Sequence, residues 1–204
     1  MQSLIKKIES LKKQPISNII SRRIKEFENN RKSNHKIFSE LCFCILTANF
    51  QAEKSIKIQK KLEKDFFLSS KKVLANKLKK EGHRFWSQRA EFICYARKQK
   101  KEIFDILKNK KEVREELFKK IKGFGMKEAS HFLRNIGYKN VAIVDFHIVD
   151  LLVKKGLIKR PKTITKKVYL QIEEVLFSLA KKTNLSLAEL DLYLWFIETG
   201  KVLK

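Results

Sequence analysis

The 204-residue sequence is poor in the residues that interrupt helices. It has only six glycines and two prolines, and strand-like alternation of apolar and polar residues is hard to find. Short strands need frequent turns, and turns need these residues, so their scarcity argues against a β-rich fold. Hydrophobic residues make up 43% of the chain, which is too many for a disordered segment. The composition therefore predicts an all-α protein, long enough for one large domain or two small lobes.

Cysteine is also scarce. Cys42, Cys44 and Cys94 are an odd set in apolar surroundings, which predicts reduced core thiols in an intracellular, cytoplasmic protein. One residue between Cys42 and Cys44 is not metal-ligand spacing, and the four histidines are scattered, so we expect no zinc site. Because the sequence has no run of about eighteen apolar residues and no apolar leader, we expect neither a membrane span nor a secretory signal.

Acidic residues are few beside the basic ones. Lys and Arg number 47 against 22 Asp and Glu, for a formal net charge of +25. A heat-adapted surface usually enriches glutamate together with lysine, and here the acids do not keep pace. The excess predicts a polyanionic partner.

Apolar residues recur at helical spacing along most of the chain. Ser69-Ser70 and Thr165 are expected helix caps, and Ser186 with Glu189 forms a predicted capping box. Residues 141–144 are β-branched or small and apolar, and we expect a buried connector there. Helices are predicted at about 4–13, 18–29, 36–48, 52–66, 71–80, 86–98, 101–107, 112–122, 127–136, 146–155, 166–182 and 187–199.

The most informative stretch contains a Gly-x-Gly turn between two predicted helices. One apolar stripe stops at Gly123-Phe124-Gly125, and a second begins at Ala129. Two short helices joined in this way expose backbone N–H groups that suit an anion such as a phosphate; the alternative is a turn that serves only as a tight connection. Lys127 falls in the first turn of the second helix, where the helix dipole favours the neutral, nucleophilic amine. Asp145 precedes a later helix, as a functional carboxylate or as a plain N-cap.

Residues 117–149 resemble the helix-hairpin-helix DNA glycosylase superfamily, whose motif ends in a catalytic aspartate. In its lyase members a lysine occupies the position of Lys127, and the aspartate occupies that of Asp145. The segments 47–50, 82–90 and 195–204 are similar to the compact archaeal and thermophile type of 8-oxoguanine DNA glycosylase/AP lyase. Superfamily members with an iron–sulfur cluster carry four spaced cysteines near the C-terminus, and this sequence does not, so we expect no cluster.

The resemblance implies a two-lobed, all-α fold that binds double-stranded DNA containing oxidised guanine. The expected lobes are a central bundle at 30–135, with the helix-hairpin-helix at about 112–136, and a second lobe of 1–29 with 136–204. Lys127 and Asp145 would face each other across a DNA cleft between these lobes. We expect a monomer that uses no organic cofactor, with a monovalent cation possible at the 123–125 hairpin.

The resemblance also implies roles for residues around the extruded base and the DNA backbone. Phe85 and Trp195 would stack on the base, although the pattern alone equally suits a core position for Trp195. Lys204 would help to read the oxidised purine, unless it is merely a frayed terminus. Asn49 would enter the duplex or cap the next helix, and His147 would touch a phosphate or bond backbone. The expected backbone contacts, besides His147, are Gly123, Gly125, Lys122 and Lys139.

The implied activity is excision of 8-oxoguanine followed by cleavage of the abasic site through a lysine Schiff base. Two alternatives stay open: a glycosylase for another damaged base, and a non-catalytic helix-hairpin-helix module. The second would need the hairpin but neither Lys127 nor Asp145.

Overall fold

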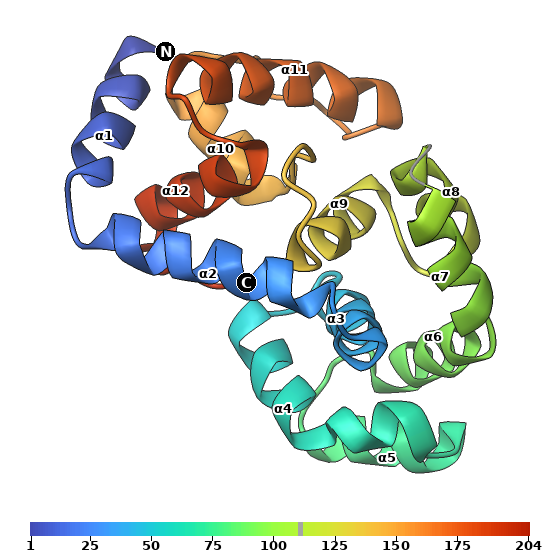
Figure 1. The fold of residues 1–204 in the computed structure, drawn as a ribbon. Helices are drawn as coiled ribbons and strands as arrows, with labels where there is room; N and C mark the ends of the chain where they lie inside the picture. Colours follow the sequence, from blue (N-terminus) through green and yellow to red (C-terminus); the bar gives the residue numbers. More distant parts are fainter. Residues whose placement is uncertain (110–111) are drawn as a thin grey trace. The chain divides into compact units, whose positions relative to one another are not determined.

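The computed structural model describes residues 1–109 and 112–204, and within them all regular structure is helical (Figure 1). This confirms the predicted all-α class, and each predicted helix is present with ends that differ by a few residues. The helices are α1 (Gln2–Lys12), α2 (Ile16–Asn30), α3 (Asn34–Thr47), α4 (Ala52–Leu68), α5 (Lys71–Lys80), α6 (Trp86–Lys98), α7 (Lys100–Asn109), α8 (Val113–Lys120), α9 (Met126–Asn135), α10 (Phe146–Lys154), α11 (Lys166–Lys182) and α12 (Leu187–Thr199).

The chain divides into two compact units. One contains residues 32–132, and the other contains residues 1–31 together with 133–204. The boundary falls within α9, which begins in the first of these and ends in the second. The predicted lobes at 30–135 and at 1–29 with 136–204, and the DNA cleft between them, stay predictions.

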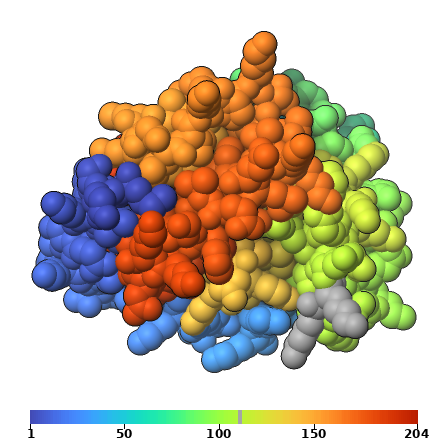
Figure 2. All heavy atoms as spheres, turned by 90° about the horizontal axis from the view of Figure 1, so that it is seen from above, coloured from blue at the N-terminus to red at the C-terminus, as the bar shows by residue number. Residues whose placement is uncertain are grey.

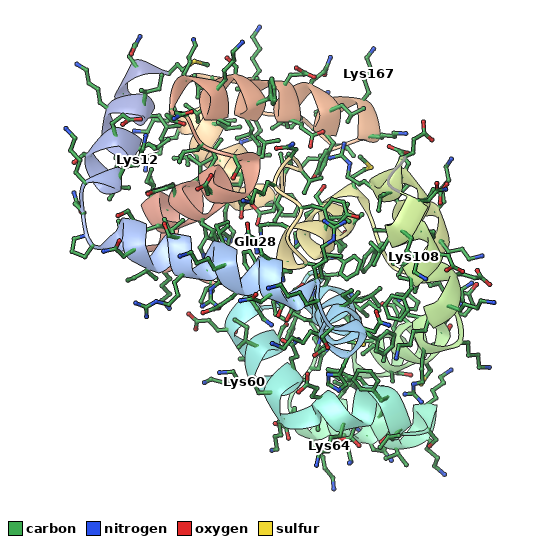
Figure 3. The ribbon with its side chains drawn as sticks, viewed as in Figure 1. Lys12, Glu28, Lys60, Lys64, Lys108 and Lys167 are labelled. Atoms are coloured by element: carbon green, nitrogen blue, oxygen red, sulfur yellow. The ribbon has the colours of Figure 1, made fainter. Side chains whose placement is uncertain are left out.

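The unit of residues 32–132 is organised around α3. Every residue from Ile37 to Thr47 is buried, including the polar Ser39 and Thr47 and the charged Glu40, because this mostly apolar helix is surrounded by the core. Helices α4 and α6 pack on α3, and α5 packs on both α4 and α6. The buried amide of Gln59 on α4 donates to the backbone and side-chain oxygens of Ser39, so this polar group is satisfied inside the core. Lys60 and Lys64 project from α4 on the solvent side (Figure 3).

The other unit is built around α12, which is buried along most of Leu187–Leu194. Helices α2, α10 and α11 contact α12, and α1 contacts α2. A buried ion pair joins Arg134 to Asp191 on α12, and the Arg134 guanidinium also donates to the Asn135 side chain. In the space-filling view, side chains of the orange segment that contains α11 project outward (Figure 2).

The predicted caps are present. Ser70 and Thr165 accept hydrogen bonds from the third residue of α5 and of α11, and Ser186 with Glu189 forms the predicted capping box of α12. Substituting such a cap typically costs about 1 kcal/mol. These local signals placed the helix starts correctly because capping depends on neighbouring residues alone.

The predicted buried connector is also confirmed. Ala142, Ile143 and Val144 are buried, and the hydroxyl of Tyr169 on α11 donates to the Ala142 carbonyl at 2.7 Å. The same hydroxyl accepts from the Val144 N–H at 3.2 Å. Backbone without secondary structure can be buried only when its polar groups are paired. These two bonds therefore fix the segment that leads to Asp145.

The free thiols agree with the sequence prediction in part. Cys42 and Cys44 are buried, and burial raises the pKa of the Cys42 thiol. Cys94 is only half-buried, with the Arg97 guanidinium 3.7 Å from its sulfur, so its expected core position is wrong. Over residues 1–109 and 112–204, none of the helices has the length and apolarity needed to cross a membrane.

Candidate active site

The hairpin between α8 and α9 depends on the glycine at position 123. Gly123 has a φ of 85°, and a Cβ there would lie 2.4 Å from the Phe92 ring, so a larger residue meets both strain and a clash. Phe124 is buried and its ring lies 6.2 Å from that of Phe132. The hairpin is thus anchored by one aromatic residue while its glycine backbone turns at the surface.

One expectation about this hairpin is corrected. We expected the Gly125 N–H to be unpaired and able to bind an external anion. It donates instead to Oε2 of Glu128 at 3.0 Å. Gly125 is the N-cap of α9, because its carbonyl accepts the first helical bond from Ala129 at 3.0 Å. Glu128 therefore supplies the carboxylate half of a capping box. A phosphate that approached this N–H would compete with an acceptor from within the chain.

Lys127 is the second residue of α9, as predicted, and its side chain is 25% exposed. Its Nζ lies 3.8 Å from Oε1 of Glu128, whose side chain is 16% exposed. The same carboxylate thus holds the hairpin with one oxygen and the lysine with the other. The half-buried Lys127 amine therefore lies within ion-pair distance of the carboxylate that also caps α9.

Asp145 is the N-cap of α10. Its Oδ1 accepts a hydrogen bond from the Ile148 N–H at 3.0 Å, so the capping interpretation is confirmed. Capping uses one carboxylate oxygen, and the helix dipole favours a negative charge at this end. Cap and reactive carboxylate are compatible roles, because the cap fixes the direction of the second oxygen. The facing of Lys127 and Asp145 stays a prediction.

His147, two residues after Asp145, contacts Trp195. The exposed His147 ring packs edge-on against the Trp195 ring, with a centroid separation of 4.9 Å. Within the described residues, the His147 side chain makes no hydrogen bond to a backbone group. Trp195 is half-buried on α12, and its Nε1 has no hydrogen-bond partner within residues 1–109 and 112–204. Phe146, between Asp145 and His147, is 70% exposed. Asp145, His147 and Trp195 therefore belong to one locality in their unit.

Asn49 and Phe85 belong to a second locality, in the other unit. Asn49 is exposed with a φ of 57°, and Gln51 is the N-cap of α4, so the alternative that Asn49 caps this helix is wrong. Phe85 is half-buried, with the guanidinium groups of Arg84 and Arg89 at 4.3 and 5.2 Å from its ring centroid. Both guanidinium groups lie over the Phe85 ring at distances at which a cation is attracted to the π-system.

The remaining predicted residues are basic. Lys122 is exposed and bonds Glu91 at 3.0 Å, and Lys139 bonds Glu28 at 2.6 Å. Lys204 is partly buried, as are Val202 and Leu203, which is not the full exposure of a frayed end. Within the part of the chain that the structure describes, no group of three or more His, Cys, Asp or Glu residues could hold a metal ion.

Three residues were not predicted from the sequence: Glu128 beside the hairpin, and His83 and Arg89 beside Asn49 and Phe85. The spacing from Gly125 to Glu128 is that of a capping box and was a usable signal. His83 and Arg89 are almost fully buried at 1% and 5% exposure. Their partners are carbonyl groups about forty residues earlier in the chain, and no local pattern reports such pairs.

An all-α chain with a Gly-x-Gly hairpin, a lysine in the following turn and an aspartate capping a later helix has the features of the helix-hairpin-helix DNA glycosylases. Comparison with known proteins narrows this class. A family model described as 8-oxoguanine DNA glycosylase matches residues 20–185. The chain belongs to this 8-oxoguanine DNA glycosylase family.

Individual relatives agree along the whole chain. The 8-oxoguanine DNA glycosylase/AP lyase of Methanocaldococcus jannaschii is 51% identical, over 98% of this chain and 99% of its own. That of Korarchaeum cryptofilum is 48% identical, over 100% and 99%. The fold matches the crystal structure of the M. jannaschii protein in complex with a 15mer DNA containing 8-oxoguanine, with a TM-score of 0.95, 50% identity and coverage of 99% and 100% of the two chains.

Proposed function

We propose that this protein excises 8-oxoguanine from double-stranded DNA and then cleaves the abasic site, with Lys127 as nucleophile and Asp145 as its carboxylate partner. The family membership and the 8-oxoguanine DNA bound by the M. jannaschii structure support the substrate. Two separate observations support the site assignment: the Lys127 amine is half-buried beside the hairpin, and Asp145 caps α10 through one oxygen of its carboxylate.

The chemistry follows from these two groups. The neutral Nζ of Lys127 attacks C1′ of the damaged nucleotide, and the bond from C1′ to the base breaks with its electron pair leaving on the base. Opening of the sugar gives an imine between Nζ and C1′. Loss of a proton from C2′ then expels the 3′ phosphate, and water later releases the sugar and restores the amine. Asp145 stabilises the positive charge that develops on the sugar and accepts the proton of Lys127.

Base extrusion precedes this chemistry. Unstacking a nucleotide costs a few kcal/mol, and phosphate contacts to a chain with a net charge of +25 help to offset it. Phe85 and Trp195 provide apolar ring faces for the extruded base, and Lys204 is placed by resemblance to read the oxidised purine. Asn49, exposed in a left-handed conformation, enters the space that the base leaves.

No organic cofactor takes part in these steps. The hairpin carbonyls suit a monovalent cation, which would fix the turn against a phosphate. In and beside the hairpin, the Ile121 carbonyl accepts a hydrogen bond from the Phe124 N–H, and the Gly125 carbonyl accepts one from the Ala129 N–H. Among the described residues, no backbone N–H donates to the carbonyls of Lys122 and Gly123. We place the protein in the cytoplasm, on the nucleoid of a prokaryote, because its substrate is chromosomal DNA, and we expect it to act as a monomer.

Borohydride trapping with a panel of damaged duplexes tests the proposal. Reduction of the imine should give a covalent complex with DNA containing 8-oxoguanine, and Lys127→Gln should abolish it. Lys64→Gln, on the exposed face of α4, is the matched control and should leave the complex unchanged. An adduct that persists in the Lys127 variant would assign the chemistry to another amine, and preference for another lesion would favour the alternative glycosylase.

Two substitutions of Asp145 separate its roles. Asparagine keeps an oxygen that can cap α10 but removes the charge, whereas alanine removes both. We expect Asp145→Asn to retain wild-type stability and lose base excision, and Asp145→Ala to lose both. DNA binding without any adduct in the wild-type protein would instead support a non-catalytic module.

A further inference from the structure

His83 connects the two segments that carry Asn49 and Phe85. Its ring is 1% exposed, and it stacks on Phe50 with a centroid separation of 4.1 Å. Nε2 lies 3.0 Å from the Leu46 carbonyl, near the end of α3, and Nδ1 lies 3.1 Å from the Phe85 backbone nitrogen. One imidazole thus contacts the backbone on both sides of the predicted base-binding region.

The partners define the protonation state of the ring. A backbone N–H can only donate, so Nδ1 must be the acceptor from Phe85, and a carbonyl can only accept, so Nε2 must carry the hydrogen. Both bonds therefore need the neutral ring with its hydrogen on Nε2. Burial lowers the pKa of His83, with a smaller lowering from the Arg89 guanidinium, and the bond to Leu46 opposes this. The neutral form is the one that the site favours.

Arg89 reinforces the same connection. It is 5% exposed, and its Nη2 donates to the Ala48 carbonyl at 2.6 Å while the guanidinium lies 5.2 Å from the Phe85 ring centroid. The carbonyls of Leu46 and Ala48 are among those that a helix end leaves unpaired. His83 and Arg89 pair them, and between Ala48 and Phe50 the chain presents Asn49 to solvent.

We propose that His83 is a positioning residue for base extrusion, which holds the Asn49 segment and Phe85 in one fixed arrangement. This inference rests on the proposed function, in which Phe85 stacks on the extruded base and Asn49 enters the vacated space. The Phe85 contact has no partner once the base is gone. His83 should therefore matter more for base excision than for cleavage of a preformed abasic site.

Two substitutions each preserve one of the two bonds. In His83→Asn the amide oxygen is close to the position of Nδ1 and can accept from Phe85, since Asn commonly bonds the backbone two residues on. In His83→Gln the amide nitrogen is close to the position of Nε2 and can donate to Leu46. His83→Ala preserves neither. Ile103→Val, in the core of the same unit on α7, is the control for a general loss of stability.

The measured quantity is the ratio of single-turnover excision of 8-oxoguanine to strand cleavage at a preformed abasic site. We expect this ratio to fall roughly threefold to tenfold in the Asn and Gln variants, as for the loss of one hydrogen bond, and further in the Ala variant. It should be unchanged in Ile103→Val. A ratio that stays at the wild-type value in the Asn and Gln variants overturns the inference, even if their thermal stability falls. Wild-type protein that cleaves abasic DNA but excises no 8-oxoguanine would instead refute the proposed function.

Discussion

Nζ of Lys127 lies 3.8 Å from Oε1 of Glu128, the neighbouring residue on α9, while Oε2 of the same carboxylate accepts the Gly125 N–H at 3.0 Å. The predicted nucleophile and the hairpin are therefore held by one side chain. Because Glu128 contacts both, it is the first residue to test.

Glu128→Gln keeps an amide oxygen for the Gly125 N–H and removes the negative charge, whereas Glu128→Ala removes the acceptor as well. We expect the alanine variant to lose about 1 kcal/mol of folding free energy, because the helix loses a cap, and the glutamine variant to lose less. Borohydride trapping should survive in the glutamine variant, because the carboxylate positions Lys127 and does not react. Complete loss of trapping in a folded glutamine variant would show that Glu128 takes part in the chemistry.

Gly137 and Gly82 offer a matched pair of substitutions. Both have positive φ, of 88° and 73°, but a Cβ at Gly137 would lie 2.9 Å from the Glu28 backbone, while a Cβ at Gly82 meets nothing within 4 Å. We expect Gly82→Ala to cost about 1 kcal/mol from left-handed backbone strain alone. Gly137→Ala should cost at least about 2 kcal/mol, since backbone must move. Chemical denaturation measures both, and equal losses would contradict the clash.

Deleting Lys204 tests its predicted role in reading the purine. We expect excision of 8-oxoguanine to weaken at least about tenfold, the effect of one lost charged contact, while nicking of an abasic site is retained. The matched variant is Lys201→Gln, which neutralises the exposed lysine at the start of the same C-terminal segment. Equal losses in both reactions would mean that the terminal residue reads no base.

Salt dependence tests the electrostatic part of binding. A protein that contacts roughly six phosphates should show a log–log slope of affinity against salt of about −5. Lys122→Gln should weaken binding to all sequences and reduce the slope by about 1. Titrations at several salt concentrations measure this, and a flat response would contradict phosphate binding by this basic chain.

The lowered pKa of His83 predicts an acid-side loss of stability. Because the folded pKa lies below the unfolded value of about 6.5, the unfolded chain binds the proton more readily. The stabilisation is therefore full above about pH 6.5 and is lost as the pH falls toward the folded pKa. Thermal unfolding between pH 7.5 and 5 should show a steeper decline for the wild type than for His83→Asn. Parallel declines would mean that the ring titrates equally in both states.

Much of the local structure could be predicted from the sequence. The starts of α5, α11 and α12 followed from Ser70, Thr165 and the Ser186–Glu189 pair, because capping involves residues three apart. The hairpin was predictable in the same way, from two glycines between apolar stripes. These features depend on interactions within one or two helical turns, so the neighbouring residues determine them.

The sequence also determined the chemical groups on which the proposed function depends: an amine in the first turn of one helix and a carboxylate at the cap of another. Only the tertiary structure decided what surrounds the predicted base-binding residues. It placed the His83 ring between Leu46 and Phe85, directed Arg89 to Ala48, and put Asn49 in a left-handed conformation instead of at a helix cap. Such contacts join segments far apart in the chain, and they form because buried donors and acceptors must find partners when the helices pack.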